Sequence, residues 1–164
     1  MILTIPRKTE YLTGEARFPE ETPLFKFSPI IGGLTFYNNY GKLVAQLFKR
    51  DGAVTLSVAD GGTLILKKKP SGEIVVEKPV AVKLDEMDNY DEGKERTIDG
   101  EIVFFGNAAE AQYEFFIRRK GEIKPHSLVQ AVAHPLSECL VNIRVADGEN
   151  LLLAVALCMA TTML

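Results

Sequence analysis

Short runs in which apolar and polar residues alternate recur along the first 146 residues of the chain. Residues 54–58, for example, read Val-Thr-Leu-Ser-Val, and such alternation places successive side chains on opposite faces of a β-strand. Asn-, Asp- and Pro-containing sequences that end in Gly separate the runs at 38–41, 51–52 and 70–72, and they favour tight turns. The pattern predicts about twelve strands in a meandering antiparallel sheet.

The last fourteen residues, 151–164, have a different pattern, because twelve of them are apolar and no face of a helix would be polar. A helix that is apolar on every side must be enclosed by protein or lipid. Fourteen helical residues span about 21 Å, whereas a bilayer core needs about 20 apolar residues. We therefore expect a buried core helix over 148–164, with a membrane tail anchor as the alternative. Asp147 is the expected N-cap, because acidic residues favour a helix N-terminus.

These two patterns predict one mainly β domain over residues 1–164, built as a closed antiparallel barrel of about twelve strands around a C-terminal hydrophobic helix. An open sheet of this size leaves two unpaired edges, and closure into a barrel removes them. The interior of a wide barrel is too large for small side chains to fill. A helix that is apolar all round would fill it.

Two segments carry a family resemblance. Residues Val141 to Leu157, VNIRVADGENLLLAVAL, give a strand, a short acidic turn and an apolar helix, and Leu34 to Phe48, LTFYNNYGKLVAQLF, give an aromatic strand that turns into another strand. In this order the chain resembles the tubby C-terminal-like superfamily, nearest to its LURP-one-related and uncharacterised bacterial members. The resemblance implies a barrel around a central helix and no common enzymatic activity. Tubby itself binds phosphoinositide head groups through basic residues, and none of those residues can be matched to a position here.

The composition is that of an ordinary globular domain, with 46% hydrophobic and 25% charged residues among 164. The net charge of −3 argues against a dedicated nucleic-acid binder. The N-terminal residues 1–11 contain no apolar signal region, so we expect a cytoplasmic location. Cys139 and Cys158 are expected to be reduced thiols. No phosphate-binding glycine loop or metal-ligand spacing is present, and we expect no cofactor.

Few residues offer catalytic chemistry. His126 and His134 are expected to be structural, although a small hydrolase or isomerase with one of them as its base at the barrel mouth is the alternative function. Cys139 paired with a histidine is a further formal arrangement. The acidic segment 85–92 is expected to be a solvated loop, and whether it binds a cation stays open. A calcium loop that starts at Asp88 would need ligands at its third and twelfth places, where Tyr90 and Asp99 stand.

Basic clusters at strand ends are the better functional lead. If the strand ends converge at a barrel rim, these clusters surround one anionic group; charged turns are also ordinary solubility devices. The sequence therefore predicts a non-catalytic binding or scaffold domain whose partner is an anionic lipid head group or another protein. The candidate binding residues are Lys67, Lys68, Lys69, Arg118, Arg119 and Lys120, with Lys49 and Arg50 as a third cluster.

Overall fold

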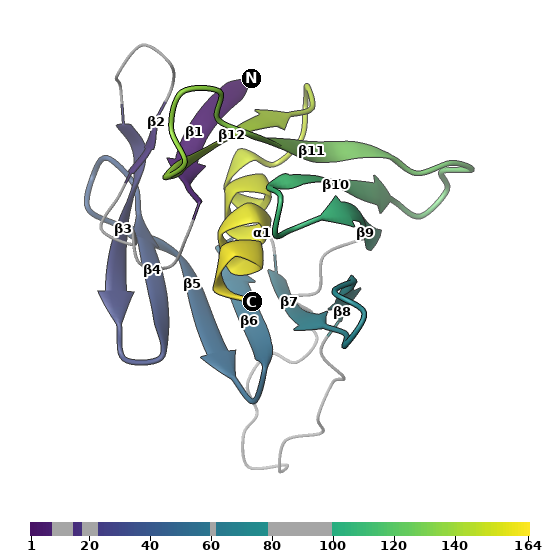
Figure 1. The fold of residues 1–164 in the computed structure, drawn as a ribbon, viewed down its shortest axis with the longest axis horizontal. Coiled ribbons are helices and arrows are strands. Elements are labelled where there is room, and N and C mark those ends of the chain that lie inside the picture. Colours follow the sequence, from purple (N-terminus) through teal and green to yellow (C-terminus); the bar gives the residue numbers. More distant parts are fainter. Residues whose placement is uncertain (8–14, 18–22, 60–61, 79–99) are drawn as a thin grey trace.

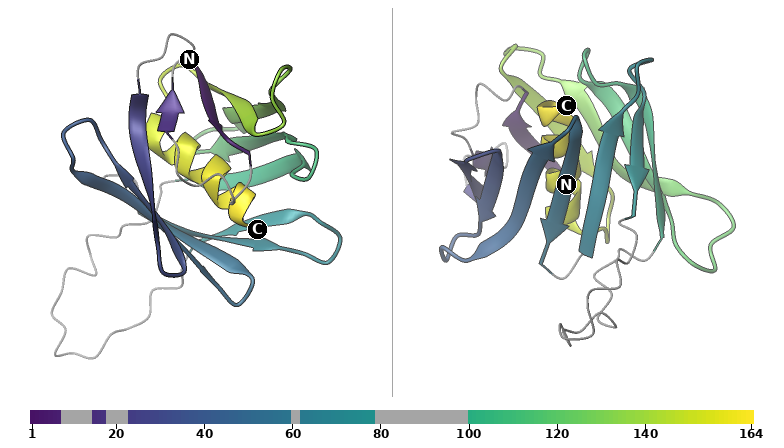
Figure 2. Two further views of the ribbon diagram at one scale, coloured as in Figure 1. Left: turned by 60° about the vertical axis from the view of Figure 1, so that its left-hand side comes forward. Right: turned by 90° about the horizontal axis from the view of Figure 1, so that it is seen from below.

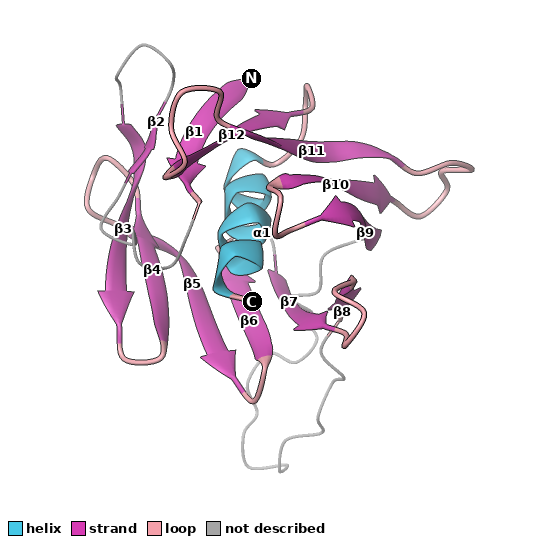
Figure 3. Cartoon of the chain, in the orientation of Figure 1, coloured by secondary structure: helices cyan, strands magenta, loops and turns pink. Residues whose placement is uncertain are grey.

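The computed structural model describes residues 1–7, 15–17, 23–59, 62–78 and 100–164. Within this part of the chain, twelve strands precede a single helix (Figures 1 and 3), which confirms the mainly β prediction. The elements are β1 (Ile2–Pro6), β2 (Glu15–Arg17), β3 (Pro23–Ile30), β4 (Gly33–Tyr37), β5 (Leu43–Arg50), β6 (Ala53–Val58), β7 (Gly62–Lys68), β8 (Ile74–Glu77), β9 (Glu101–Asn107), β10 (Gln112–Arg118), β11 (His126–Ala133), β12 (Leu140–Val145) and α1 (Leu151–Met163).

The strands form an antiparallel meander in the order β8-β7-β6-β5-β4-β3-β2-β1-β12-β11-β10-β9. β1 pairs with β12 over five residues, so the first and last strands of the chain lie side by side. The Thr4 hydroxyl also contacts the Asn142 side chain at 3.1 Å across this pair. The sheet curls around α1 (Figure 2), as the meander and the apolar helix together predict.

The hairpin turns have the geometry that their residues favour. Asp51 and Gly52 both have positive φ, at 52° and 76°, and a two-residue hairpin of this type needs two such angles. At the next turn toward the N-terminus, the Asn38 side chain accepts hydrogen bonds from the backbone N–H groups of Tyr40 and Lys42. Side-chain capping of this kind is why Asn is common in turns.

Closure of the sheet is incomplete among the described residues. No hydrogen-bonded pair joins β8 to β9, although Cα atoms of the two strands approach within 8 Å. At the other weak point, β1 and β2 share only the pair Thr4 and Arg17. The connection from β8 to β9 lies outside the described residues, and so does the acidic segment 85–92. A closed barrel therefore stays a prediction.

The helix is enclosed as predicted. Every residue from 153 to 161 is buried, and none exposes more than 5% of its surface. α1 packs against β5 and β6 on one side and against β1, β11 and β12 on another. Inward-facing residues of the strands complete the core, among them Phe36, Leu66 and Phe115, which are fully buried. No helix in the described ranges has the length and apolar character that crossing a membrane requires.

The helix begins three residues later than predicted, at Leu151 rather than at Gly148. Gly148 has a φ of 79°, which lies in the left-handed region and prevents a right-handed helix from including it. The side chain of Asn150 accepts a hydrogen bond from the Leu153 backbone N–H at 3.0 Å. Asn150, and not Asp147, is thus the N-cap, because the turn through Gly148 separates Asp147 from the first helical N–H groups.

Candidate functional site

The first predicted basic cluster, residues 67–69, is held largely by neighbouring glutamates. Lys67 forms an ion pair of 2.9 Å with Glu77, and Lys69 lies 3.7 Å from Glu73. All four side chains are about half exposed, and such surface pairs are worth little in stability. This arrangement is typical of solubilising charges at a hairpin.

Lys68 lines a separate pocket with Arg7 at the C-terminal end of α1, with a volume of about 200 Å³. The hydroxyls of Thr161 and Thr162, which also line it, donate to the helix carbonyls of Leu157 and Met159. Those hydroxyl protons are therefore already engaged. Because the C-terminal end of a helix carries partial negative charge, an anion is disfavoured here despite the two cations.

The six predicted residues do not converge on one site. Lys68 stands opposite Ile74, at the start of β8, whereas residues 118–120 lie beside Lys78, just beyond the other end of β8. The third cluster lies with the first, because Arg50 and Lys67 both pair with Ala53 of β6. The basic clusters at 49–50 and 67–69 thus lie at one mouth of the sheet. Residues 118–120 lie at the opposite mouth, where α1 begins.

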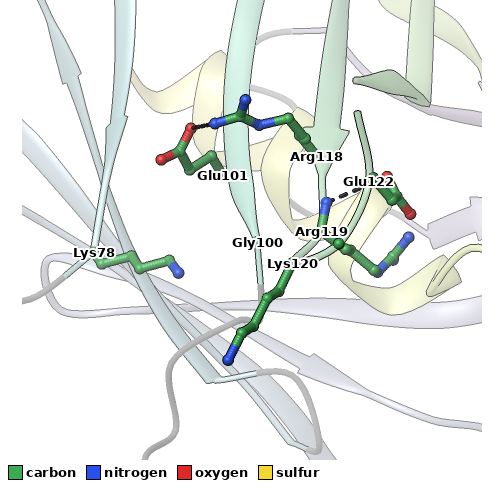
Figure 4. Close-up of a pocket in the computed structure, with 8 residues that line it drawn as sticks. Lys78, Gly100, Glu101, Arg118, Arg119, Lys120 and Glu122 are labelled. Carbon is green, nitrogen blue, oxygen red and sulfur yellow. Dashed lines mark hydrogen bonds and ion pairs between the residues drawn. The ribbon is translucent and has the colours of Figure 1, made fainter. Parts of the chain in front are cut away.

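The basic cluster at 118–120 borders a pocket of about 290 Å³ (Figure 4). Its walls are Lys78 after β8, Gly100 and Glu101 at the start of β9, and residues 118–122 from the end of β10. The pocket therefore lies at the seam where β8 and β9 are not hydrogen-bonded. Four basic side chains and two carboxylates line it, so its charge is positive. We refer to it as the seam pocket.

The basic residues of the seam pocket differ in how they are engaged. Arg118 forms an ion pair of 3.0 Å with Glu101 across the β9–β10 pair. Lys78 and Lys120 are exposed and have no ion pair within the described ranges. Figure 4 shows the Lys78 and Lys120 side chains lying apart from the ion pair of Arg118 with Glu101, while Arg119 points away from both lysines. Lys78 and Lys120 are therefore the side chains best placed to meet an external anion.

Arg119 belongs to a partly buried ionic cluster next to the pocket. Its guanidinium forms two parallel contacts with Glu149, of 2.8 and 2.5 Å. The Glu149 side chain is only 6% exposed and comes from the turn between β12 and α1. Bidentate pairs of this kind are among the strongest charge-assisted hydrogen bonds. The pair ties the β10–β11 turn to the segment that leads into the helix.

His126, the first residue of β11, joins the same cluster through both ring nitrogens. Nε2 lies 2.7 Å from Glu149 Oε1, and Nδ1 lies 3.0 Å from Glu122 Oε2. Carboxylates only accept hydrogen bonds, so contacts at both nitrogens require a proton on each, which makes the ring an imidazolium. Arg119 Nη1 is also 3.4 Å from Nε2, but the contact with Glu149 is shorter. We call Arg119, Glu122, His126 and Glu149 the ionic clasp.

The ionic clasp shifts the acidities of its members. Hydrogen bonds from Arg119, helped by His126, lower the pKa of Glu149 to about 2, although burial opposes this shift. The hydrogen bond to Glu149, supported by Glu122, raises the pKa of His126 against the opposing effect of its partial desolvation. Both shifts favour the charged forms that the geometry requires.

The two histidines of the alternative enzymatic function already have hydrogen-bond partners. A general base needs an unprotonated nitrogen that faces a substrate, and both nitrogens of His126 face carboxylates. His134 accepts a hydrogen bond at Nδ1 from the Leu136 backbone N–H, beside its own turn. Both cysteines are free thiols, and burial raises the pKa of Cys158 to about 12, so that thiol is not a nucleophile near neutral pH.

Two functional residues were not anticipated from the sequence. Lys78 is a single lysine after a strand, so it does not belong to a run of consecutive basic residues. Glu149 was expected to lie in the first turn of the helix, where its role would be to favour the helix dipole. The available signal was its position directly before an apolar helix, where an acidic residue needs a partner once it is buried.

Neither a family model, nor a curated protein, nor a solved structure matches the chain. The resemblance to the tubby C-terminal-like superfamily thus remains a prediction. Within the described ranges, no group of three His, Cys, Asp or Glu side chains is placed to hold a metal ion. The acidic segment 85–92 lies outside those ranges.

Proposed function

We propose that this chain is a non-catalytic binding domain that takes a compact anionic group, such as the phosphate of an anionic lipid head group, in the seam pocket. The observation that carries the proposal is the presence of Lys78 and Lys120 at one positively charged pocket, without ion pairs to other described residues. Two ammonium groups offer charge-assisted hydrogen bonds to a doubly charged oxyanion. Arg118, already paired with Glu101, adds positive potential at the pocket wall.

The contacts around the pocket hold the backbone of the β10–β11 turn in place, which supports a binding role. Arg119 and Glu122 are held by the ionic clasp, and the glycine at 121 closes the turn with a φ of 90°. The backbone of the turn is therefore fixed while the side chains of Lys78 and Lys120 extend outward. A scaffold that leaves only its ligand-contacting groups free loses little conformational entropy on binding.

Binding is tested by titrating the protein with sodium sulfate or inorganic phosphate while recording backbone amide NMR shifts. Vesicle sedimentation, with phosphatidylcholine alone or mixed with phosphatidylserine, then separates a free anion from a lipid head group as the source. We expect shifts centred on residues 118–122 and sedimentation only with the anionic vesicles. Affinity should fall as salt is raised, because the pocket is open to solvent.

The matched variants are the double substitutions Lys78→Ala/Lys120→Ala and Lys67→Ala/Lys69→Ala. Both remove two positive charges, so a general effect of net charge is the same for each. The first should weaken anion binding by about tenfold or more, since each lost charge-assisted hydrogen bond is worth about 1.5–3 kcal/mol. The second should leave binding within about twofold. Equal losses in the two variants, or no binding by the parent protein, would overturn the proposal.

The closed tubby-like barrel belongs to the same proposal. It is supported by the meander order, by the enclosed helix and by the approach of β8 to β9 within 8 Å. Nuclear Overhauser contacts between backbone protons of β8 and β9 test it directly. Their absence, with rapid amide exchange along both strands, would show an open sheet.

A further inference from the structure

The ionic clasp and the seam pocket share the turn between β10 and β11. Glu122 borders the pocket, and its carboxylate accepts the Arg119 backbone N–H at 3.3 Å while facing His126 Nδ1 at 3.0 Å. A change in the charge of His126 therefore acts on a carboxylate that borders the pocket. The side chains of His126 and Glu122 are 42% and 34% exposed, so solvent protons reach both.

We propose that His126 is a pH-responsive clasp whose protonated ring holds the Glu122 carboxylate, and whose deprotonation releases that carboxylate beside the seam pocket. The ligand-binding consequence rests on the proposed function. The release of Glu122 does not, because it follows from the contacts of the ring alone.

The choice of Glu122 follows from the hydrogen-bond inventory of imidazole. A neutral ring has a single N–H, so it can keep only one of its two carboxylate partners. The contact with Glu149 is the shorter, at 2.7 Å, and the Glu149 side chain is 6% exposed. Losing a partner costs more for a buried carboxylate than for an exposed one. The remaining proton therefore stays on Nε2, and Glu122 is the partner released.

The groups that face His126 come from two turns. Glu122 and Arg119 lie on the β10–β11 turn, and Glu149 lies on the β12–α1 turn, while α1 has no charged residue. Arginine keeps its charge throughout the neutral range, and the pKa of Glu149 lies far below it. His126 is the member of the ionic clasp whose ordinary pKa lies close to neutral pH. The hydrogen bond to Glu149 and the charge of Glu122 raise its pKa, which places the switch on the alkaline side of an ordinary histidine.

The consequence for an anion is a loss of affinity as the pH rises. Deprotonation removes one positive charge from the cluster and leaves the Glu122 carboxylate at the pocket wall without its contact to the ring. We expect sulfate binding to weaken by about two- to fivefold across the transition, the effect of one unit charge near a solvent-exposed site. Sulfate is the suitable probe, because its charge does not change in this range while that of phosphate does.

The chain has only two histidines, so the test has an internal control. NMR titration should give His126 a midpoint above the ordinary histidine value of 6.5, and Glu122→Gln should lower that midpoint without changing the resonances of the His134 ring. Sulfate affinity should fall with pH in the parent and in His134→Gln, should fall less in Glu122→Gln, and should become independent of pH in His126→Gln. Glu122→Gln keeps the ring and thus serves as the variant least prone to disturb the fold.

The outcomes separate the two proposals. If the His126 midpoint is at or below 6.5, or if Glu122→Gln leaves it unchanged, the clasp proposal is overturned whatever sulfate does. If sulfate binds with an affinity that ignores pH, the clasp proposal also fails and the binding proposal stands. If sulfate does not bind at any pH, the seam pocket fails as an anion site, and a raised His126 midpoint that depends on Glu122 still supports the clasp.

Discussion

The chain contains two basic clusters that have nearly the same form in sequence, residues 67–69 and residues 118–120. Each has three consecutive basic residues at the end of a strand, before a turn that contains glycine. In the folded protein they lie at opposite mouths of the curled sheet. Lys67 and Lys69 pair with exposed glutamates of the same hairpin, whereas Arg119 holds a buried glutamate thirty residues further along the chain.

The difference shows that the partner, and not the cluster, decides what a run of basic residues does. A pair within one hairpin is screened by water on all sides and is worth about 0–1 kcal/mol. A pair whose carboxylate is buried couples two distant segments, and removing one member leaves the other uncompensated. The cluster with a buried partner also borders the seam pocket, so the same turn combines a fixed backbone with the exposed lysine at 120.

The largest expected effect comes from truncating the buried pair. Arg119→Ala leaves the Glu149 carboxylate without its main partner, and we expect a loss of about 2–4 kcal/mol in the free energy of unfolding. Lys67→Ala, the matched change in the other cluster, should cost less than about 0.5 kcal/mol. Urea denaturation measures both. Similar losses in the two variants would show that the clusters do not differ energetically.

The next effect is on stability in acid. The folded protein holds the pKa of Glu149 at about 2, below its ordinary value of 4.5, so its contribution is complete above pH 4.5 and is lost as the pH falls toward 2. We expect this contribution to be about 1–3 kcal/mol. Urea denaturation across this range should show a shallower acid loss for Glu149→Gln than for the parent. Glu77→Gln, from the exposed pair, should keep the slope of the parent protein.

The start of the helix, at the same mouth as the ionic clasp, gives a smaller effect. Asn150→Ala removes the side chain that accepts the Leu153 N–H, and should destabilise the protein by about 1 kcal/mol. Asp147→Ala should change stability by less than about 0.3 kcal/mol, because Asp147 does not cap the helix. Thermal unfolding of the two variants compares them. A larger loss of stability for Asp147→Ala than for Asn150→Ala would show that Asp147 is the N-cap, as the sequence predicts.

The smallest effect is on the alkaline side. The pKa of His126 is raised in the folded protein, so its stabilising contribution is complete below its ordinary value of 6.5 and is lost as the pH rises through the folded value. Because the ring is 42% exposed, this loss should be smaller than that from Glu149 in acid. Denaturation of the parent, His126→Gln and His134→Gln between neutral and mildly alkaline pH measures it. An equal alkaline loss in all three would assign it to another group.

Much of the fold was predictable because it depends on local patterns. The turns at 38–41 and 51–52 follow from the side-chain capping of Asn and from the positive φ that an Asp-Gly pair tolerates. The strands follow from alternation, which needs no knowledge of the partner strand. The start of the helix was less predictable, because both Asp147 and Asn150 are competent caps, and the left-handed turn at Gly148 selects between them.

The candidate site was only half predictable. The sequence indicated residues 118–120 as candidates, but it grouped them with 67–69 because strand ends look alike when the mouth of the sheet is unknown. The sequence indicated no partner for His126. Glu149 contacts that ring because β11 pairs with β12 and the turn after β12 carries Glu149 back to the start of β11. Lys78 lies at the seam pocket because it follows the end of β8, and the end of β8 lies beside the start of β9.

The sequence by itself determined that the chain is a β-meander and that its C-terminal helix is surrounded by protein. Both follow from free energies that depend on the residues alone: turn preferences, and the cost of leaving an all-round apolar helix in water. Tertiary structure decided which carboxylate each basic cluster meets and where two lysines remain without one among the residues that the structure describes. Those outcomes depend on distances between segments far apart in the chain, and electrostatic energies change with distance and burial in a way that residue order does not encode.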